Sequence, residues 1–139
     1  MKEMEYDKVY KSVHLTETLL DWHFKGYHFI ILNLGTHPTA YVEIPEGHKL
    51  FGKEYDDCNI DVHGGVTYSE DNLTYLRYSD KYKCDTLCKK KDTWFIGWDY
   101  AHLNDYTGFT KCYGDVKWTT ARIVNECKDV INQLKEMET

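Results

Sequence analysis

Two short segments of this chain place histidines beside aspartates, the residue types that most readily hold and donate protons. Residues 61–65 read Asp-Val-His-Gly-Gly, and residues 98–102 read Trp-Asp-Tyr-Ala-His. An imidazole next to a carboxylate can act as a general acid or base, or can bind a divalent metal. The candidate catalytic residues of a small metal-assisted hydrolase, acting on a phosphodiester or nucleotide, are therefore Asp61, His63, Asp99 and His102.

A more ordinary interpretation of the same residues is structural. Isolated pairs of this kind are mostly hydrogen-bonded histidines beside solvated aspartates. On that interpretation the chain binds no metal and no cofactor, and its function is binding without catalysis. Five cysteines do not favour zinc, because only Cys84 and Cys88 are closely spaced and structural zinc sites use paired ligands. We keep the hydrolase as the alternative.

The second segment lies in the part of the chain richest in aromatic residues. Residues 94–98 read Trp-Phe-Ile-Gly-Trp, which is typical of a buried strand, and the polar groups follow where that strand should end. Polar side chains on an apolar scaffold at strand ends often form ligand sites. The chain contains twelve tyrosines and four tryptophans, an excess that suits either a binding surface or a ring-filled core.

Length and charge narrow the classes of function. A chain of 139 residues predicts one globular domain spanning residues 1–139. The net charge of −6, with only two arginines among 17 basic residues, disfavours direct binding of nucleic acid. The charged first residues lack a signal-peptide core, and the longest apolar run, residues 29–32, is too short to cross a membrane. We therefore expect a cytoplasmic protein whose cysteines are free thiols. The protein can form a homo-oligomer.

The pattern along the chain predicts an α+β fold. Residues 9–22 fit a short strand followed by a helix beginning near Thr16. Residues 27–34 and 39–44 fit the two arms of a hairpin, and residues 80–92 fit an exposed lysine-rich segment. Further strands are expected at residues 60–68, 73–78 and 93–99. The prediction is a mostly antiparallel sheet of about five to six strands, packed by a C-terminal helix and a short N-terminal helix.

The C-terminal helix has the strongest signal in the chain. From Thr120 onward, apolar residues recur every three or four positions, which makes one apolar helical face. Thr119 or Thr120 is the expected N-cap. The residues of the apolar face are Ile123, Val124, Cys127, Val130, Ile131, Leu134 and Met137.

The glycine pair bears on the position of the first histidine. Within an expected strand over residues 60–68, Asp61 and His63 point to the same side, and Gly64 and Gly65 leave room beside them.

Residues 14–16 and 37–39 both read His-x-Thr, a triplet of the two-histidine phosphoesterases. Their close spacing and a proline in the second triplet disfavour that family. No Gly-rich phosphate loop opens a helix.

Several motifs together resemble small uncharacterised proteins encoded in phages and prophages of Gram-positive bacteria. The resemblance covers most of the chain and is carried by residues 37–45, 47–48, 52–57, 61–68 and 97–102. Small acidic phage proteins of this kind are often anti-defence factors. The resemblance therefore implies a non-enzymatic inhibitor of a host defence protein, either an anti-CRISPR protein that occludes a nuclease or a sponge that sequesters a nucleotide-derived signal.

The two forms of this inhibitor would use different residues. In the protein-binding form, carboxylates face a basic partner surface; they are Asp56, Asp57, Glu70, Asp71 and Asp105. In the sponge form, aromatic rings stack on a base while basic groups lie near the phosphates. The residues of that ligand site are Trp98, Tyr100, His102, His63, Gly64, Gly65, Lys53 and Arg77.

Overall fold

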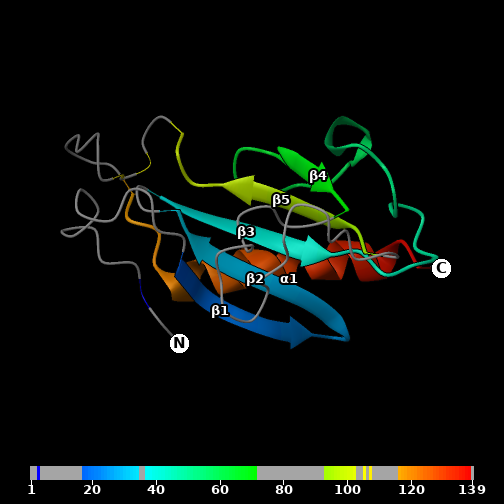
Figure 1. The fold of residues 1–139 in the computed structure, drawn as a ribbon, viewed down its shortest axis with the longest axis horizontal. Helices are drawn as coiled ribbons and strands as arrows, with labels where there is room; N and C mark the ends of the chain where they lie inside the picture. Colours follow the sequence, from blue (N-terminus) through cyan, green and yellow to red (C-terminus); the bar gives the residue numbers. More distant parts are fainter. Residues whose placement is uncertain are drawn as a thin grey trace.

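A computed structural model describes residue 3 and residues 17–34, 37–71, 93–102, 105, 107 and 116–138. The described part has two layers, a sheet and one helix lying across one face of it (Figure 1). The elements in chain order are β1 (Glu17–Phe24), β2 (Tyr27–Asn33), β3 (Pro38–Glu43), the 3-10 helix η2 (Tyr55–Asp57), β4 (Tyr68–Glu70), β5 (Phe95–Asp99) and α1 (Thr120–Glu136). None of the described helices is long and apolar enough to cross a membrane.

The sheet has five strands in the order β1-β2-β3-β5-β4, and every neighbouring pair is antiparallel. The predicted hairpin is confirmed, with Phe29 of β2 opposite Val42 of β3. A two-residue turn joins β1 to β2, and both of its residues, Lys25 and Gly26, have positive φ. Such turns match the right-handed twist of paired strands. The fold is therefore α+β with an antiparallel sheet.

The C-terminal helix is confirmed as α1, and its apolar face packs on β1, β2 and β3 (Figure 1). Thr119 is the N-cap, and its side chain accepts a hydrogen bond of 3.3 Å from the backbone N–H of Arg122. The buried residues on the packed face are Thr120, Ile123, Cys127, Val130, Ile131 and Leu134.

Strand β2 is buried on both of its faces. Phe29 and Ile31 join the large cluster beneath α1, whereas Ile30 and Leu32 belong to a second cluster with Tyr41 and Phe95. Successive strand residues point to opposite faces of a sheet. Because both faces are covered, β2 reads in the sequence as a continuous apolar run and not as an alternation.

Two of the expected elements are wrong. The short N-terminal helix beginning near Thr16 is not seen, because residues 17–24 form β1 and pair with β2 through the tight turn. The expected strand over 60–68 exists only at its end, where Tyr68 begins β4. Gly64 and Gly65 have positive φ, which a pleated strand does not accommodate. The predicted strand over 73–78 and segment 80–92 lie outside the described residues.

Replacing the N-cap residue should weaken α1. We expect Thr119→Ala to lower the free energy of unfolding by about 1 kcal/mol, because the N–H of Arg122 loses its acceptor. Urea denaturation followed by circular dichroism measures this change. Thr119→Ser keeps the hydroxyl oxygen and should stay within about 0.5 kcal/mol of the wild type. Equal losses for the two variants would contradict the assignment of the cap.

His28 should make the stability of the sheet depend on pH. His28 Nε2 lies 2.6 Å from Asp21 Oδ1, and Nδ1 lies 3.1 Å from Glu43 Oε1. The hydrogen bond with Glu43 raises the pKa of His28; burial opposes this, and Asp21 raises the pKa further. Because the pKa of His28 is raised in the folded protein, its charged form stabilises the fold fully below the ordinary histidine pKa of about 6.5. This stabilisation disappears as pH rises through the pKa of His28 in the folded protein.

The corresponding measurement compares the wild type with His28→Gln over a range of pH. We expect the variant to be less stable by about 1 kcal/mol near pH 6 and the difference to shrink as pH rises through the raised folded-state pKa of His28. A difference that grows with pH would contradict the assignment.

Candidate functional site

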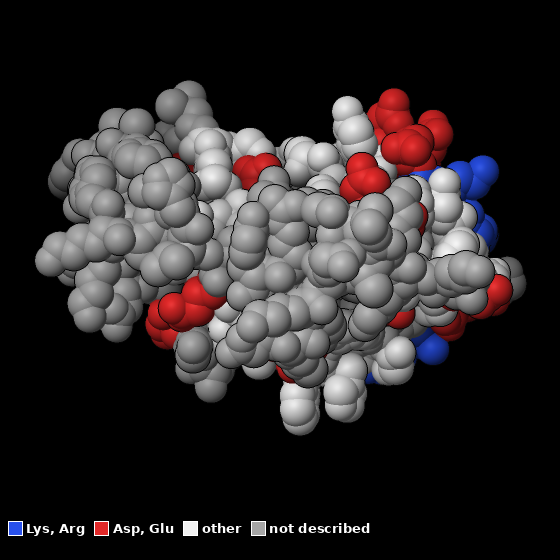
Figure 2. All heavy atoms as spheres, viewed as in Figure 1, with Lys and Arg blue, Asp and Glu red and all other residues white. Residues whose placement is uncertain are grey.

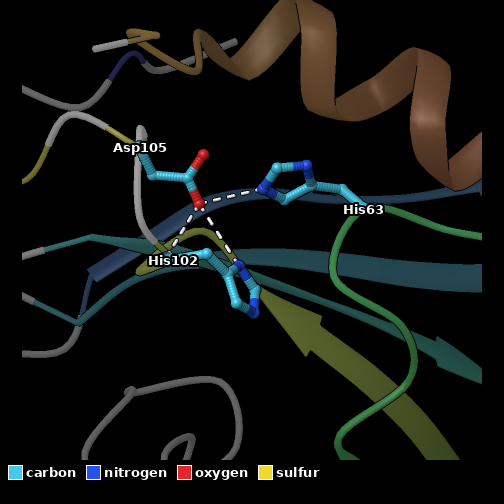
Figure 3. A group of neighbouring side chains, drawn as sticks. All are labelled: His63, His102 and Asp105. Carbon is cyan, nitrogen blue, oxygen red and sulfur yellow. Dashed lines mark hydrogen bonds and ion pairs between the residues drawn. The ribbon is translucent and has the colours of Figure 1, made fainter.

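Three separate segments meet where β5 ends and α1 begins. His63 comes from the turn over residues 62–65, which is closed by a 2.9 Å hydrogen bond from Gly65 N–H to Val62 O. His102 and Asp105 follow β5, and Trp118 directly precedes the N-cap of α1. Figure 3 shows both imidazoles directed at one carboxylate. We call His63, His102 and Asp105 the imidazole–carboxylate cluster.

Asp105 is the centre of this cluster and is only 3% exposed. Its Oδ2 accepts a 3.0 Å hydrogen bond from the backbone N–H of His102, and lies 2.9 Å from His63 Nε2 and 3.3 Å from His102 Nδ1 (Figure 3). Its Oδ1 accepts a 2.9 Å bond from Trp118 Nε1. Burial raises the pKa of Asp105, but hydrogen bonds from His63, the His102 amide and Trp118 outweigh it and hold the pKa below its usual value. Asp105 is therefore a buried anion.

The His63 ring is fixed by its aromatic neighbours. It stacks on Tyr100 with 5.1 Å between centroids and an interplanar angle of 7°, and it contacts Trp118 at 4.7 Å. Tyr100 is held in turn, because its hydroxyl accepts from Trp98 Nε1 at 2.8 Å and donates to Glu126 at 2.7 Å. Packing and hydrogen bonds thus orient the imidazole before any ligand arrives.

Gly64 allows the two histidines to approach each other. The centroids of the His63 and His102 rings are 5.2 Å apart, and Gly64 lies against the His102 ring. A Cβ atom at position 64 would overlap the ring atoms of His102. Gly64 also has a φ of +70°, a conformation that other residues rarely adopt. Glycine is therefore required here for two independent reasons.

Two further titratable groups border the cluster. Asp99 is half-buried, and its Oδ1 lies 3.7 Å from His102 Nε2. The Asp99 carboxylate also accepts hydrogen bonds from the Ala101 N–H at 3.2 Å and from Thr67 Oγ1 at 3.5 Å. Burial lowers the pKa of His37; the charges of Asp99 and Asp105 oppose this shift, and that of His102 adds to it. His37 is thus within electrostatic range of the cluster.

The structure brings together three of the four predicted catalytic residues: His63, Asp99 and His102. Asp61 is not part of this group. Its side chain is exposed, and its backbone N–H and C=O bond to the side-chain amide of Gln133 at 2.8 and 2.7 Å. The prediction placed Asp61 beside His63 because it assumed a strand, and the turn at residues 62–65 removes that relationship.

Three roles predicted for the inhibitor forms are wrong. Asp105 cannot face a partner, because it is buried within the protein. Trp98 and Tyr100 cannot stack on a base, because they are 1% and 0% exposed and belong to the core beneath α1. Their hydrogen-bonding groups are occupied by each other and by Glu126.

The remaining predicted residues are divided between the two ends of β5. Gly65 lies in the turn beside His63, with open space around its Cα. Lys53 lies at the opposite end, where its carbonyl accepts a 3.1 Å hydrogen bond from the Trp94 indole. Asp56, Asp57 and Glu70 are exposed and Asp71 is half-buried, and Glu70 pairs with Phe95 at the start of β5. Arg77 lies outside the described residues.

Sequence reasoning missed Trp118 and the central role of Asp105, and it considered His37 only as part of a His-x-Thr triplet. The spacing of three residues between His102 and Asp105 is compatible with a turn, and that turn is closed by a 2.9 Å bond from Asp105 N–H to His102 O. Trp118 carried no signal of its own, because its position depends on contacts between distant segments. Comparisons of the chain with protein-family models, curated proteins and solved structures find no match.

Proposed function

We propose that this protein is a small metal-assisted hydrolase that acts on a phosphodiester or nucleotide at the imidazole–carboxylate cluster. One observation supports this function above the others: a buried, ionised carboxylate fixes two imidazoles from different segments at a single point. Maintaining such an anion inside a protein is costly unless its partners are well arranged. Groups held in this way are common at catalytic centres.

The residues can be assigned distinct roles in hydrolysis. Asp105 orients His63 and His102, as the carboxylate of a catalytic triad orients its histidine. A divalent ion held by the cluster would polarise the phosphoryl oxygen and the attacking water. Asp99 is half-buried beside His102, and its carboxylate oxygen is the group we assign to accept the proton of that water. His37 borders the same region, and burial lowers its pKa, which favours the neutral imidazole.

Hydrolysis should depend on Asp99 and not on Asp61. The assay uses bis-p-nitrophenyl phosphate, cyclic dinucleotides and nucleoside triphosphates, each with added Mn²⁺ or Zn²⁺. We expect Asp99→Asn to reduce kcat by about 10²–10⁴-fold, the usual contribution of a general base. Asp61→Asn is the matched control, since Asp61 is exposed and outside the cluster, and it should keep the wild-type rate. The proposal fails if no substrate is turned over, or if both variants behave alike.

A second candidate function, a phage-encoded anti-defence protein that binds a host component, is favoured by a different surface. Tyr55 is 47% exposed and lies among exposed carboxylates on η2 and at the end of β4. Figure 2 shows acidic side chains gathered over this end of the molecule. We call Tyr55, Asp56, Asp57 and Glu70 the acidic surface. An exposed tyrosine with carboxylates beside it suits a partner with a basic surface, such as a CRISPR nuclease with its nucleic-acid groove.

Two hydrogen bonds connect the acidic surface to the sheet. The Tyr55 N–H donates a 2.8 Å hydrogen bond to Ser69 Oγ, which donates in turn to Glu54 at 3.3 Å. These bonds tie η2 to β4. The sponge form has less support, because its two proposed stacking residues, Trp98 and Tyr100, are buried.

Charge reversal separates this candidate from the hydrolase. If the protein occludes a defence nuclease, the wild type should inhibit DNA cleavage by the purified nuclease. Asp56→Lys/Asp57→Lys should then abolish inhibition, because like charges across an interface repel. Asp129→Lys/Glu136→Lys makes the same change in charge on exposed positions of α1 and should leave inhibition intact. Equal effects of the two pairs would exclude a specific acidic surface.

A further inference from the structure

We propose that His63 Nε2, His102 Nδ1 and Asp105 Oδ2 together bind one first-row transition-metal ion of the zinc class. This inference rests on the proposed function for its biological purpose, and it identifies the ligands and the class of metal. In the described part of the chain, the possible ligand atoms of these two histidines and one aspartate all lie within 4.8 Å of one another. The main prediction from the sequence was that no metal binds, and its hydrolase alternative placed a metal near Asp61, His63, Asp99 and His102, without Asp105.

Two of the three separations between the ligand atoms fit a metal-bound geometry, and all three atoms lie within 4.8 Å of one another. Metal–ligand bonds to histidine nitrogen and carboxylate oxygen are about 2.0–2.2 Å long. Two such ligands subtending an angle between octahedral and tetrahedral lie about 3.0–3.4 Å apart. His63 Nε2 and His102 Nδ1 lie 2.9 and 3.3 Å from Asp105 Oδ2. A small movement of the two imidazoles toward each other completes a three-ligand site.

Both types of ligand have supporting partners behind them. Trp118 Nε1 holds Asp105 Oδ1 at 2.9 Å, which leaves Oδ2 directed at the histidines. The outer nitrogen of His102, Nε2, lies 3.7 Å from Asp99 Oδ1. Metal-binding histidines usually have a carboxylate or carbonyl behind the ring, and metal-binding carboxylates are themselves hydrogen-bonded.

The donor set favours transition metals over the common hard cations. Imidazole nitrogens suit zinc, copper, iron and nickel, whereas magnesium, calcium and manganese prefer oxygen ligands. Three protein ligands leave at least one position for water or substrate, as in catalytic zinc sites. His102 and Asp99 are half-buried, so this position is reachable from solvent.

Calorimetric titration of the full-length, chelator-treated protein tests the site without any substrate. We expect one Zn²⁺ or Co²⁺ per chain and no measurable heat with Mg²⁺ or Ca²⁺.

His63→Ala and His102→Ala should each weaken binding by more than about a hundredfold, since losing even a partner behind a ligand costs about 10–100-fold. His23→Ala removes an exposed histidine outside the cluster and should bind as the wild type does. Trp118→Phe keeps an aromatic ring but loses the indole N–H that holds Asp105, and it should weaken binding about 10–100-fold.

The outcomes separate this inference from the hydrolase. Circular dichroism verifies that each variant is folded, and Trp118→Phe serves as the milder test if a ligand variant unfolds. An unchanged affinity in both His63→Ala and His102→Ala, as thiol ligands would give, overturns the inference. So does the absence of binding by the wild type. Zinc binding without turnover removes the hydrolase and leaves the site. Turnover that survives chelation contradicts the metal-assisted mechanism, while the calorimetric titration alone decides whether the site binds metal.

Discussion

Replacing Asp105 by alanine should lower the free energy of unfolding by about 3–5 kcal/mol, the usual cost of breaking a buried charged network. The substitution leaves the His102 amide and the Trp118 indole without their acceptor, and it removes the anion between two imidazoles. Urea denaturation at neutral pH measures the loss. Asp99→Ala removes the half-buried carboxylate at the end of β5 and should lower the free energy of unfolding by no more than about 1–2 kcal/mol.

The pH dependence of this loss gives a second test of the same prediction. The pKa of Asp105 is lowered in the fold, so its stabilisation is present above the unfolded-state value of about 3.9 and is lost as pH falls through the folded-state pKa. The difference in stability between the wild type and Asp105→Ala should therefore narrow as pH falls below about 3.9 and through the folded-state pKa. A loss under about 1 kcal/mol at neutral pH would show that the carboxylate is not the centre of a buried network.

The substitution Gly64→Ala should destabilise the protein by about 2–4 kcal/mol, since it combines left-handed backbone strain with a steric overlap. The added methyl group meets the His102 ring, which must move away from His63. Metal affinity should fall together with stability, although Gly64 contributes no ligand. Chemical denaturation and calorimetry of the same variant measure the two effects.

Gly65→Ala is the matched control for the neighbouring glycine. Gly65 also has a positive φ, of +79°, but a Cβ there would meet no atom within 4 Å. Only the backbone strain remains, so the expected cost is about 1–2 kcal/mol with metal affinity unchanged. Equal costs at the two positions would mean that the contact between Gly64 and His102 does not shape the site.

The parts of the fold that could be predicted are those with a local signal. An apolar face at helical spacing and an N-cap threonine predict the helix α1, and both features are confirmed. The β2–β3 hairpin follows from two apolar runs separated by a turn. Strand β1 was mistaken for a helix because acidic and apolar residues over 17–24 fit either element. Its pairing with β2 through the two-residue turn at Lys25 and Gly26 decided the outcome, and the sequence analysis did not recognise that turn.

The candidate site shows the same limit more clearly. The histidine and aspartate types at residues 63, 99 and 102 were sufficient to indicate chemistry, and the structure does bring these residues together. Asp105 was assigned to the surface because an acid in a loop is usually solvated. Its burial depends on donors from His63 and Trp118, which lie 42 and 13 residues away in the chain. No periodic pattern encodes such an arrangement.

The most direct measurement of the central claim is anomalous X-ray diffraction at the zinc absorption edge, from crystals of the full chain grown with Zn²⁺. We predict one peak per chain, about 2.0–2.2 Å from a nitrogen of His63, a nitrogen of His102 and an oxygen of Asp105. Density showing the three side chains apart, or a peak bound by cysteine thiolates with none at the end of β5, would contradict the account.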